Sequence, residues 1–378
     1  MRRLLATAAL GLCLALPGSG SAEPLSKPLR AAVAAKAGTT VVVENLAGRL
    51  EVVKGGGAEA VLSGTARCDA GAATSSQALL DAVAVRVREA GGAVTLHVDY
   101  PVERAPFRYE REGSSHSGWN RSSSNVEYQG RQVKVQEGGS APLLQADLKL
   151  EVPAGVAVHV VNHVGRVVAR DVGGALEVKT ASADVSAETI AGEAEVRTGS
   201  GDVRVRDAAG LDVHTGSGDV DAEKVAGTVS VRTGSGDVRL GRAEASRVSV
   251  RTGSGDIELD GAAGELELNT GSGDIRGRAV AGVSRLDVGT GSGEVSLSIE
   301  TSAFGGGTVE TASGDVHLSL LSGPAMRLSV STASGDIDTE GLPVTRLEKR
   351  GERSLVAEVR GGGPLLKVST ASGSVRIR

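Results

Sequence analysis

A six-residue motif, Thr-Gly/Ala-Ser-Gly/Ala-Asp-Val/Ile, recurs along this 378-residue sequence and restricts its fold more than any other feature. Its threonine stands at positions 180, 198, 215, 233, 252, 270, 290, 311, 332 and 370. Successive copies are 17 to 21 residues apart, except for a last interval of 38, which is twice 19. Self-similarity at a short period without helical spacing is typical of stacked coils. The repeat therefore predicts a solenoid.

Two segments before the repeats resemble diverged copies of the motif. Residues 162–167 begin 18 residues before Thr180, and residues 45–50 have a similar pattern. The long interval before Thr370 predicts a degenerate coil near residues 347–355. We expect roughly twelve coils from residue 155 onward, which at ~4.8 Å per coil form a rod on the order of 55 Å long.

Within one copy the residues alternate between two faces. Val229, Val231 and Thr233 share one side of an extended segment, and Val238 and Leu240 continue that side after Gly-Ser-Gly. Thr233 and Val238 are five residues apart, an odd number, so the turn between them must reset the alternation. Glycine permits this because it adopts backbone angles that other residues avoid. Each coil is thus predicted to contain at least two short strands joined by a Gly-Ser-Gly corner.

The composition agrees with a thin core and many tight turns. Glycine occurs 54 times and aromatic residues make up 2%, so the core must consist of Val, Leu, Ile, Ala and Thr. We therefore predict an all-β protein, a single parallel β-helix (β-solenoid) with about 18–21 residues per coil. The formal net charge of -5 gives no reason to expect nucleic acid as a partner, because its binding depends on a basic surface.

The first 22 residues have the pattern of a signal peptide. Arg2 and Arg3 precede an apolar run, and small residues up to Ala22 form a cleavage site. Lipidation at Cys13 is the less favoured alternative, because a bulky leucine precedes it where lipoprotein signals place a small residue. Nothing later approaches the length of a transmembrane helix. We expect export to the periplasm, the outer surface or the extracellular medium.

The mature chain is expected to have two parts. Residues 23–154 form a β-rich opening region with an insertion at 103–140, and residues 155–378 form the repeats. In the opening region, residues 83–87 and 94–98 alternate as strands do. Cys68 is the one cysteine left after signal removal, which excludes an internal disulfide and favours a small buried side chain.

The sequence resembles the DUF4097 family of β-strand repeat proteins, whose members are labelled as adhesins. The resemblance rests on the repeated Thr-Gly-Ser-Gly-Asp-Val blocks, the lead-in at 148–153 and the closing block at 370–375. It extends from residue 40 to residue 378 and is interrupted at 103–140. The resemblance implies a parallel β-helix in the cell envelope and implies no catalytic residues.

An acidic residue near the end of each copy is the first candidate for ligand chemistry. This acidic ladder consists of Asp184, Asp202, Asp219, Asp237, Asp256, Asp274, Glu294, Asp315 and Asp336. Stacked carboxylates repel by about 1 kcal/mol per adjacent pair in water, so something must offset the repulsion. One interpretation is calcium, with ligands among Asp202, Asp219, Asp237, Asp256 and Asp274. The favoured one is that each Asp accepts hydrogen bonds from its own Gly-Ser-Gly turn, with Arg197, Arg232 and Arg251 nearby.

No position in the repeats stands out as an active site. Some parallel β-helices cleave polysaccharides with paired carboxylates, and Asp219-x-Asp221 and Asp336-x-Asp338 are such pairs. However, both pairs occupy repeat positions, and Phe304 is the only aromatic residue after Tyr128 that could contact a sugar. The threonines are expected to be buried and to form hydrogen bonds along the stack. We expect a protein that is not an enzyme.

Residues 103–140 differ in composition from the rest of the chain. Aromatic residues and arginines are interleaved there with a Ser/Gly/Asn-rich run, which is typical of binding loops. The predicted contact residues are Phe107, Arg108, Tyr109, Arg111, Trp119, Arg121 and Tyr128. The alternatives are a cap over the N-terminal end of the solenoid and an unstructured segment.

Together these features predict a non-enzymatic, exported cell-envelope protein that acts as an adhesin or interaction scaffold without a required cofactor. Its expected partner is a protein or a surface glycan. A calcium-stabilised structural rod is the second interpretation, and an extracellular carbohydrate-active β-helix enzyme is the third.

Overall fold

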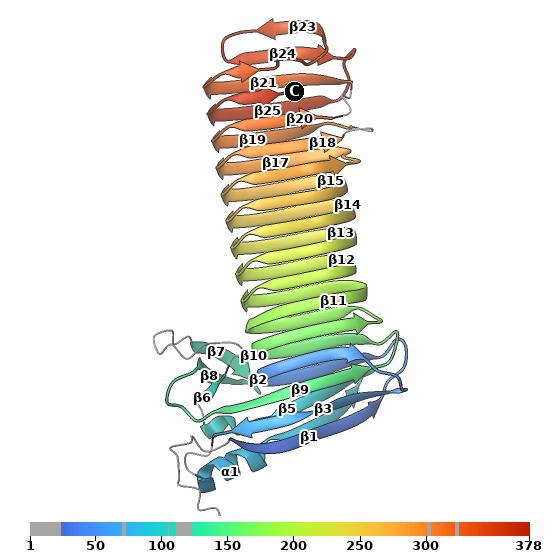
Figure 1. The fold of residues 1–378 in the computed structure, drawn as a ribbon, viewed down its shortest axis with the longest axis vertical. Helices are drawn as coiled ribbons and strands as arrows, with labels where there is room; N and C mark the ends of the chain where they lie inside the picture. Colours follow the sequence, from blue (N-terminus) through green and yellow to red (C-terminus); the bar gives the residue numbers. More distant parts are fainter. Residues whose placement is uncertain (1–23, 70–72, 105, 111–122, 301–303, 322–324) are drawn as a thin grey trace, which may run out of the picture.

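The computed structural model describes residues 24–378 except 70–72, 105, 111–122, 301–303 and 322–324, so the predicted signal peptide lies outside the described residues. Figure 1 shows a long stack of strands that rises from a wider base. Strands make up 75% of the chain and helices 3%, and most strands belong to one large, mostly parallel sheet. The predicted all-β solenoid is confirmed. No helix in the described part is long and apolar enough to cross a membrane.

Parallel strands that pair in register from coil to coil build the stack. Its lower part consists of β2 (Thr40–Lys54), β10 (Ala157–Val172), β11 (Leu176–Ser200), β12 (Val203–Ser217), β13 (Val220–Ser235), β14 (Val238–Ser254) and β15 (Ile257–Ser272). Its upper coils contain β16 (Ile275–Ala281), β17 (Arg285–Ser292), β18 (Val295–Glu300), β19 (Gly307–Ser313), β20 (Val316–Leu320), β21 (Met326–Ser334) and β22 (Ile337–Asp338). The register places each motif threonine beside the next, as Thr233 lies between Thr215 and Thr252.

The inward residues form continuous columns of aliphatic side chains. One fully buried column contains Val196, Val213, Val231, Val250 and Leu268. Burial of one such side chain stabilises the fold by about 1.5–3 kcal/mol, so the aliphatic columns supply most of the core of the coils. The core also includes the aromatic side chain of Phe304, which the composition did not predict. Such a core needs only a thin space between two layers of strands.

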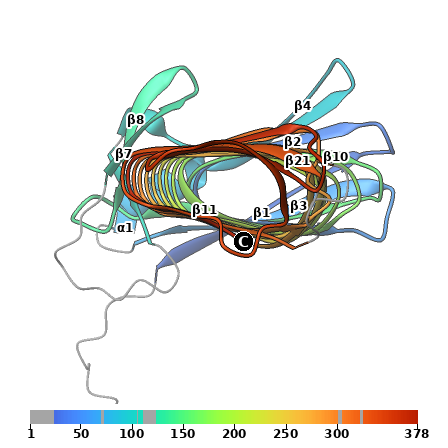
Figure 2. The same ribbon diagram turned by 90° about the horizontal axis from the view of Figure 1, so that it is seen from above.

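Each coil is flattened, with two long sides joined by tight corners (Figure 2). We call the side that leads to the threonine, such as residues 229–233, face 1, and the side after the Gly-Ser-Gly corner, such as residues 238–242, face 2. Thr233 and Val238 are both buried, and Gly236 between them has a φ of 151°. The predicted reset of the alternation at the corner is confirmed.

Antiparallel strands close the N-terminal end of the stack. β5 (Ala93–Asp99) and β9 (Leu144–Val152) pair parallel with the two halves of β2 and together complete one coil. Beyond them, β4 (Ala84–Ala90) pairs with β5, β3 (Glu59–Cys68) with β9, and β1 (Leu25–Ala34) with β3, all antiparallel. Helix α1 (Ala73–Ala82) packs against β1 and β3. The strands predicted near 83–87 and 94–98 are confirmed as β4 and β5.

The stack of coils begins before residue 155, where we predicted the repeats to start. β2 pairs with β10 so that Asn45 lies opposite Asn162 and Gly48 opposite Gly165, which confirms the similarity of 45–50 to 162–167. Both asparagines are fully buried, and Asn45 Nδ2 donates to Asn162 Oδ1 at 2.9 Å. The two asparagines therefore continue the threonine column into the base.

The prediction of a degenerate coil near residues 347–355 is wrong. β23 (Val344–Arg350) and β24 (Ser354–Val359) form an antiparallel hairpin there, and β24 pairs antiparallel with β21. Every residue of β23 is exposed, because its charged side chains lie on both sides of the strand and cannot form a buried column. The hairpin closes the C-terminal end of the stack, where an open parallel edge would invite aggregation.

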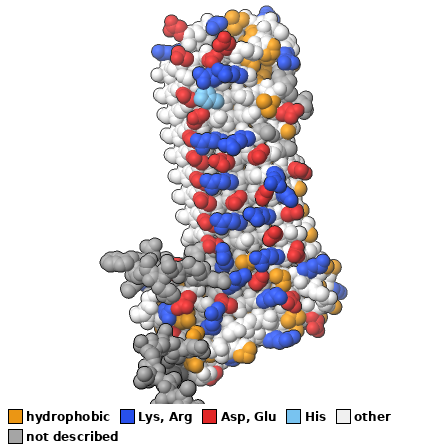
Figure 3. Space-filling model, viewed as in Figure 1, with side chains coloured by type: hydrophobic (Ala, Val, Ile, Leu, Met, Phe, Trp, Pro, Cys, Tyr) orange, Lys and Arg blue, Asp and Glu red, His pale blue; other side chains and the backbone are white. Residues whose placement is uncertain are grey.

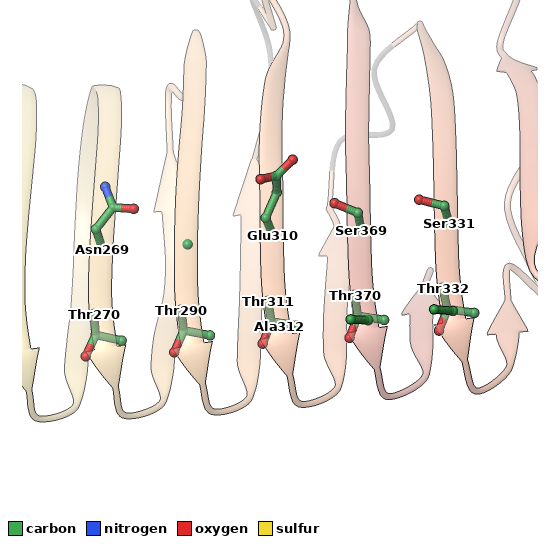
Figure 4. Close-up of a pocket in the computed structure, with 13 residues that line it drawn as sticks. Asn269, Thr270, Thr290, Glu310, Thr311, Ala312, Ser331, Thr332, Ser369 and Thr370 are labelled. Carbon is green, nitrogen blue, oxygen red and sulfur yellow. The ribbon is translucent and has the colours of Figure 1, made fainter.

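The last coil of the chain is not the last coil of the stack. β25 (Leu365–Ser372) pairs parallel with both β19 and β21, and β26 (Val375–Ile377) pairs with both β20 and β22. Figure 4 shows Thr370 between Thr311 and Thr332. The chain thus leaves a one-coil gap after β20, forms the coil of β21 and the closing hairpin, and returns to fill the gap.

Candidate functional site

The insertion forms a small sheet beside the first coils (Figure 1). Its strands are β6 (Phe107–Tyr109), β7 (Ser123–Tyr128) and β8 (Arg131–Glu137), with β8 in the middle. Phe107, Tyr109 and Tyr128 are all buried. The prediction that these three residues contact a partner is wrong, because their rings are packed inside the protein.

Arg108 also has partners within the chain. Its guanidinium lies 3.0 Å from Asp69 and 2.7 Å from Glu110. The other predicted contact residues, Arg111, Trp119 and Arg121, lie outside the described residues. Since strands β1, β3 and β4 close the N-terminal end and β6–β8 form a sheet, neither the cap nor the unstructured alternative fits the described part of the insertion.

Tyr128 attaches the small sheet to the solenoid. Its ring stacks on His97 at a centroid distance of 5.3 Å and meets the edge of His163 at 5.6 Å. Glu44 lies 3.8 Å from His163 Nε2 and 2.8 Å from His97 Nδ1, and these two imidazoles lower its pKa to about 2. The cluster joins β2, β5, β7 and β10, so it holds the insertion against the first coils.

The acidic ladder is connected by a hydrogen bond that runs from coil to coil. Asp237 N donates to Asp219 Oδ1 and Asp256 N donates to Asp237 Oδ1, both at 2.9 Å. The same bond recurs with Asp184, Asp202, Asp256 and Asp274 as acceptors. The expectation that each Asp accepts from its own turn is therefore wrong. The backbone N–H of Asp256 donates to the preceding coil. The N–H groups of its neighbours Gly255 and Ile257 donate to the following coil.

Arginines of face 2 add ion pairs to this ladder. Arg239 lies 3.1 Å from Asp237, and Arg276 lies 3.4 Å from Asp256 and 2.6 Å from Asp274. These arginines follow the corner in sequence. The three predicted to offset the ladder, Arg197, Arg232 and Arg251, instead belong to face 1, so that part of the expectation is also wrong.

We expect millimolar calcium to change the Tm by less than about 2 °C, because backbone amides and arginines already satisfy the ladder. Among the described residues, no group of three or more His, Cys, Asp or Glu side chains could hold a metal ion. Thermal unfolding followed by circular dichroism, with calcium and then with a chelator, measures the difference. A rise of roughly 10 °C that the chelator reverses would favour the calcium-stabilised rod instead.

Two shallow depressions lie on face 1 over the first glycine or alanine of the motifs, one in the lower coils and one in the upper coils, and we call them together the trough. Its floor consists of the motif threonines and the outward backbone at positions such as Gly199, Gly216 and Gly234. A Cβ at Gly216 or Gly234 would lie 2.6 Å from a carbonyl oxygen in the preceding coil. Close stacking therefore requires glycine there, and the absence of side chains makes the trough smooth.

The wall of the trough is the column of residues directly before the threonines. In its lower part the wall consists of Lys179, Arg197, His214 and Arg232. In its upper part, shown in Figure 4, it consists of Asn269, Gly289, Glu310, Ser369 and Ser331. The wall is thus basic near the base and uncharged or acidic near the tip.

Face 2 carries charges that alternate in sign from coil to coil. Arg204, Asp221, Arg239, Glu258 and Arg276 occupy one column of the register. Rows of basic and acidic side chains alternate in this way in Figure 3. Each charge has neighbours of opposite sign, as Arg239 lies 3.7 Å from Glu258. Face 2 therefore neutralises itself and has little attraction for a charged ligand.

The side chains considered for catalysis have structural roles. Asp338 accepts from the backbone N–H of Glu340 and lies 3.1 Å from Arg376, and these two interactions lower its pKa. From Thr252 onward the threonine hydroxyls are buried and donate to glycine carbonyls of the adjacent coil, as Thr252 Oγ1 does to Gly236 O at 3.2 Å. Thr198 Oγ1 instead donates to Ser200 O in its own coil. The expected burial of the threonine column is confirmed from Thr198 onward, and the expected hydrogen bonds along the stack are confirmed from Thr252 onward.

Our sequence reasoning missed the trough and the cluster around Tyr128. The trough could have been found by aligning the copies on their threonines, which places Lys179, Arg197 and Arg232 at one repeat position. No such signal exists for the cluster, because its residues come from four segments that are distant in sequence.

Residues 208–378 match a protein-family model described as Toastrack DUF4097, which confirms the predicted resemblance over this range. No curated protein matches the sequence. One similar solved structure is described as a putative cell adhesion protein from Clostridium sporogenes ATCC 15579, with 10% identity, coverage of 93% of this chain and 99% of that chain, and a TM-score of 0.17. Another, a putative adhesin from Bacteroides fragilis NCTC 9343, has 10% identity, coverage of 93% and 97%, and a TM-score of 0.26. These TM-scores are too low to support an argument about this chain.

Proposed function

We propose that the protein, whose residues 208–378 match the Toastrack DUF4097 family model, is an exported, non-enzymatic cell-envelope component that acts as an adhesive or interaction scaffold. The observation that carries this proposal is the trough of face 1, which presents polar groups at the same place in one coil after another. Such a surface suits a long, regular ligand. Small substrates instead occupy concave and largely apolar pockets.

The non-enzymatic part of the proposal is supported by the way the carboxylates are used. An active site gathers a few ionisable groups with perturbed pKa values at one place. In this solenoid the acidic residue recurs in coil after coil and accepts the same backbone N–H each time. The Asp-x-Asp pairs thus belong to columns that hold the coils together.

The export part of the proposal rests on residues 1–22. Their basic start, apolar run and small residues before Glu23 are the pattern of a cleaved signal. The single buried cysteine of the mature chain, Cys68, is compatible with an oxidising compartment, because it leaves no thiol exposed.

A tagged full-length chain, expressed in cells, tests both parts. We expect the mature protein to begin at Glu23 by mass spectrometry and to be absent from the cytoplasmic fraction. Beads coated with the purified protein should bind bacterial envelope preparations saturably, because repeated coils offer many equivalent contacts. An unprocessed chain in the cytoplasm would contradict the export proposal. Binding no greater than that of albumin-coated beads would contradict the adhesive role.

A further inference from the structure

The acidic column that accompanies the basic wall of the trough is interrupted in two coils. Two residues before the wall, face 1 carries Glu177, Glu195, Asp212, Ser230, Ser249 and Glu267 in successive coils. The acids pair with wall residues where they occur: Arg197, for example, contacts both Glu177 and Glu195. The two serines stand beside Arg232 and Arg251, where the wall remains basic.

Arg232 consequently has no carboxylate partner among the described residues. Its Nη1 lies 3.2 Å from Ser230 Oγ and 3.2 Å from His214 Nε2. Its neighbour Arg251 shares Glu267 with Ser249. Arg232 is therefore a wall cation that no carboxylate of the described residues offsets, and Arg251 in the next coil has further N–H donors besides the one that Glu267 accepts.

The buried threonine column beneath the section of the trough between His214 and Arg251 has fewer hydrogen bonds than it has in later coils. The hydroxyls of Thr215 and Thr233 are buried, with 6% and 7% of each residue exposed, and have no partner among the described residues. Thr252, Thr270 and Thr290 in later coils instead donate to glycine carbonyls. Thr215 and Thr233 line the depression that Arg232 borders. These hydroxyls do not reach the surface, so the basic wall at Arg232 is the feature of this section that a ligand can contact.

We propose that this section of the trough binds the carboxylate groups of an extended acidic glycan that lies along the rod. A guanidinium binds a carboxylate through two parallel hydrogen bonds. Arg232 and Arg251 place one guanidinium each in adjacent coils. Serine hydroxyls beside them and the glycine floor can contact sugar hydroxyls without obstruction. This inference rests on the proposed adhesive function and specifies its ligand class.

The spacing and composition of the trough favour a glycan over an acidic peptide. Equivalent groups recur every ~4.8 Å along the stack, whereas an extended peptide advances ~3.3 Å per residue and its side chains would fall out of step. One pyranose unit of an extended chain is similar in length to the coil spacing. The charged side chains that border the depression, Lys179, Arg197 and Arg232, are suited to carboxylates, whereas protein partners bind mainly through large aromatic anchors.

Calorimetry of the purified full-length protein with oligogalacturonate, a chain of carboxylated sugars, tests the proposal. We expect saturable binding that weakens as salt is added, since the contacts are exposed ion pairs. Arg232→Gln with Arg251→Gln should weaken binding at least about tenfold. The matched control is Arg242→Gln with Arg278→Gln, which removes the same charge from face 2 and should change binding less than about twofold.

Three results would overturn the proposal. The first is no binding of oligogalacturonate, and the second is an equal loss in both double variants with unchanged Tm values. The third is equally strong binding of polyglutamate that depends on Arg232 and Arg251, since it would make the ligand an acidic peptide. Adhesion of coated beads to envelope preparations is measured separately, so failure of this inference is distinguishable from failure of the proposed function.

Discussion

Gly236→Ala is expected to destabilise the solenoid by more than about 3 kcal/mol, an exceptional effect for the addition of one methyl group. The new Cβ would lie 2.1 Å from the carbonyl oxygen of Gly218 in the preceding coil, and Gly236 has a φ of 151°, which other residues rarely adopt. The two coils cannot move apart to make room, because each also pairs with the coil on its other side.

Gly241→Ala in the same coil is the matched control. The nearest atom to its added Cβ is Glu223 Cγ at 3.7 Å, and its backbone has no positive φ. We expect a change within about 1 kcal/mol, since alanine also restricts the unfolded chain. Urea unfolding gives the global effect, and hydrogen exchange gives the local one, because coils of a repeat protein can unfold separately. Equal effects of the two substitutions would contradict the structure of the corner.

The periodic part of the fold could be predicted from the sequence because every coil buries the same residue types at the same positions. Thr233, the Gly-Ser-Gly corner and Val238 recur at one spacing, so periodicity alone fixes the inward side and the parallel register. The prediction for the corner glycines was correct for Gly236. Gly234 has no positive φ and is required because a Cβ would meet Gly216 O at 2.6 Å. That difference depends on the distance between coils, which one coil's sequence does not encode.

The candidate site was harder to predict because composition does not distinguish a buried residue from an exposed one. Tyr128 and Phe107 occur beside arginines and serines, as in binding loops, yet both side chains are buried. The ring of Tyr128 packs against His97 and His163, which are distant in sequence. The acidic ladder was recognised from its period. The direction of its hydrogen bonds was not, because the acceptor for Asp237 N lies on the preceding coil and not within the motif.

The order of the last coils could not be predicted for a related reason. Thr311, Thr332 and Thr370 begin nearly identical motifs, so any of the three coils can stack on any other with the same contacts. Their order is decided by the connections between them. The closing hairpin occupies residues 344–359 and pairs with β21, which leaves the gap after β20 as the place for residues 365–377.

Removal of residues 365–378 is therefore expected to unfold the whole tip of the rod. The deletion removes four fully buried side chains, Leu366, Val368, Val375 and Ile377. At about 1.5–3 kcal/mol each, their loss amounts to roughly 6–12 kcal/mol, comparable to the stability of an entire domain. Because β25 and β26 lie between two other coils, residues 326–359 would lose their connection to the stack.

Hydrogen exchange followed by mass spectrometry distinguishes this arrangement from a simple linear stack. We expect residues 326–359 to lose protection in the truncated protein while residues 203–275 keep it. If the last coil stood at the end of the rod, its removal would expose only one edge and residues 326–359 would stay protected, which would contradict the inserted coil. A pair of point substitutions gives an independent check within the intact chain. Leu366→Ala should cost about 2–5 kcal/mol because Leu366 is fully buried between coils, whereas Leu365→Ala, at a residue that is 49% exposed, should cost less than about 1 kcal/mol.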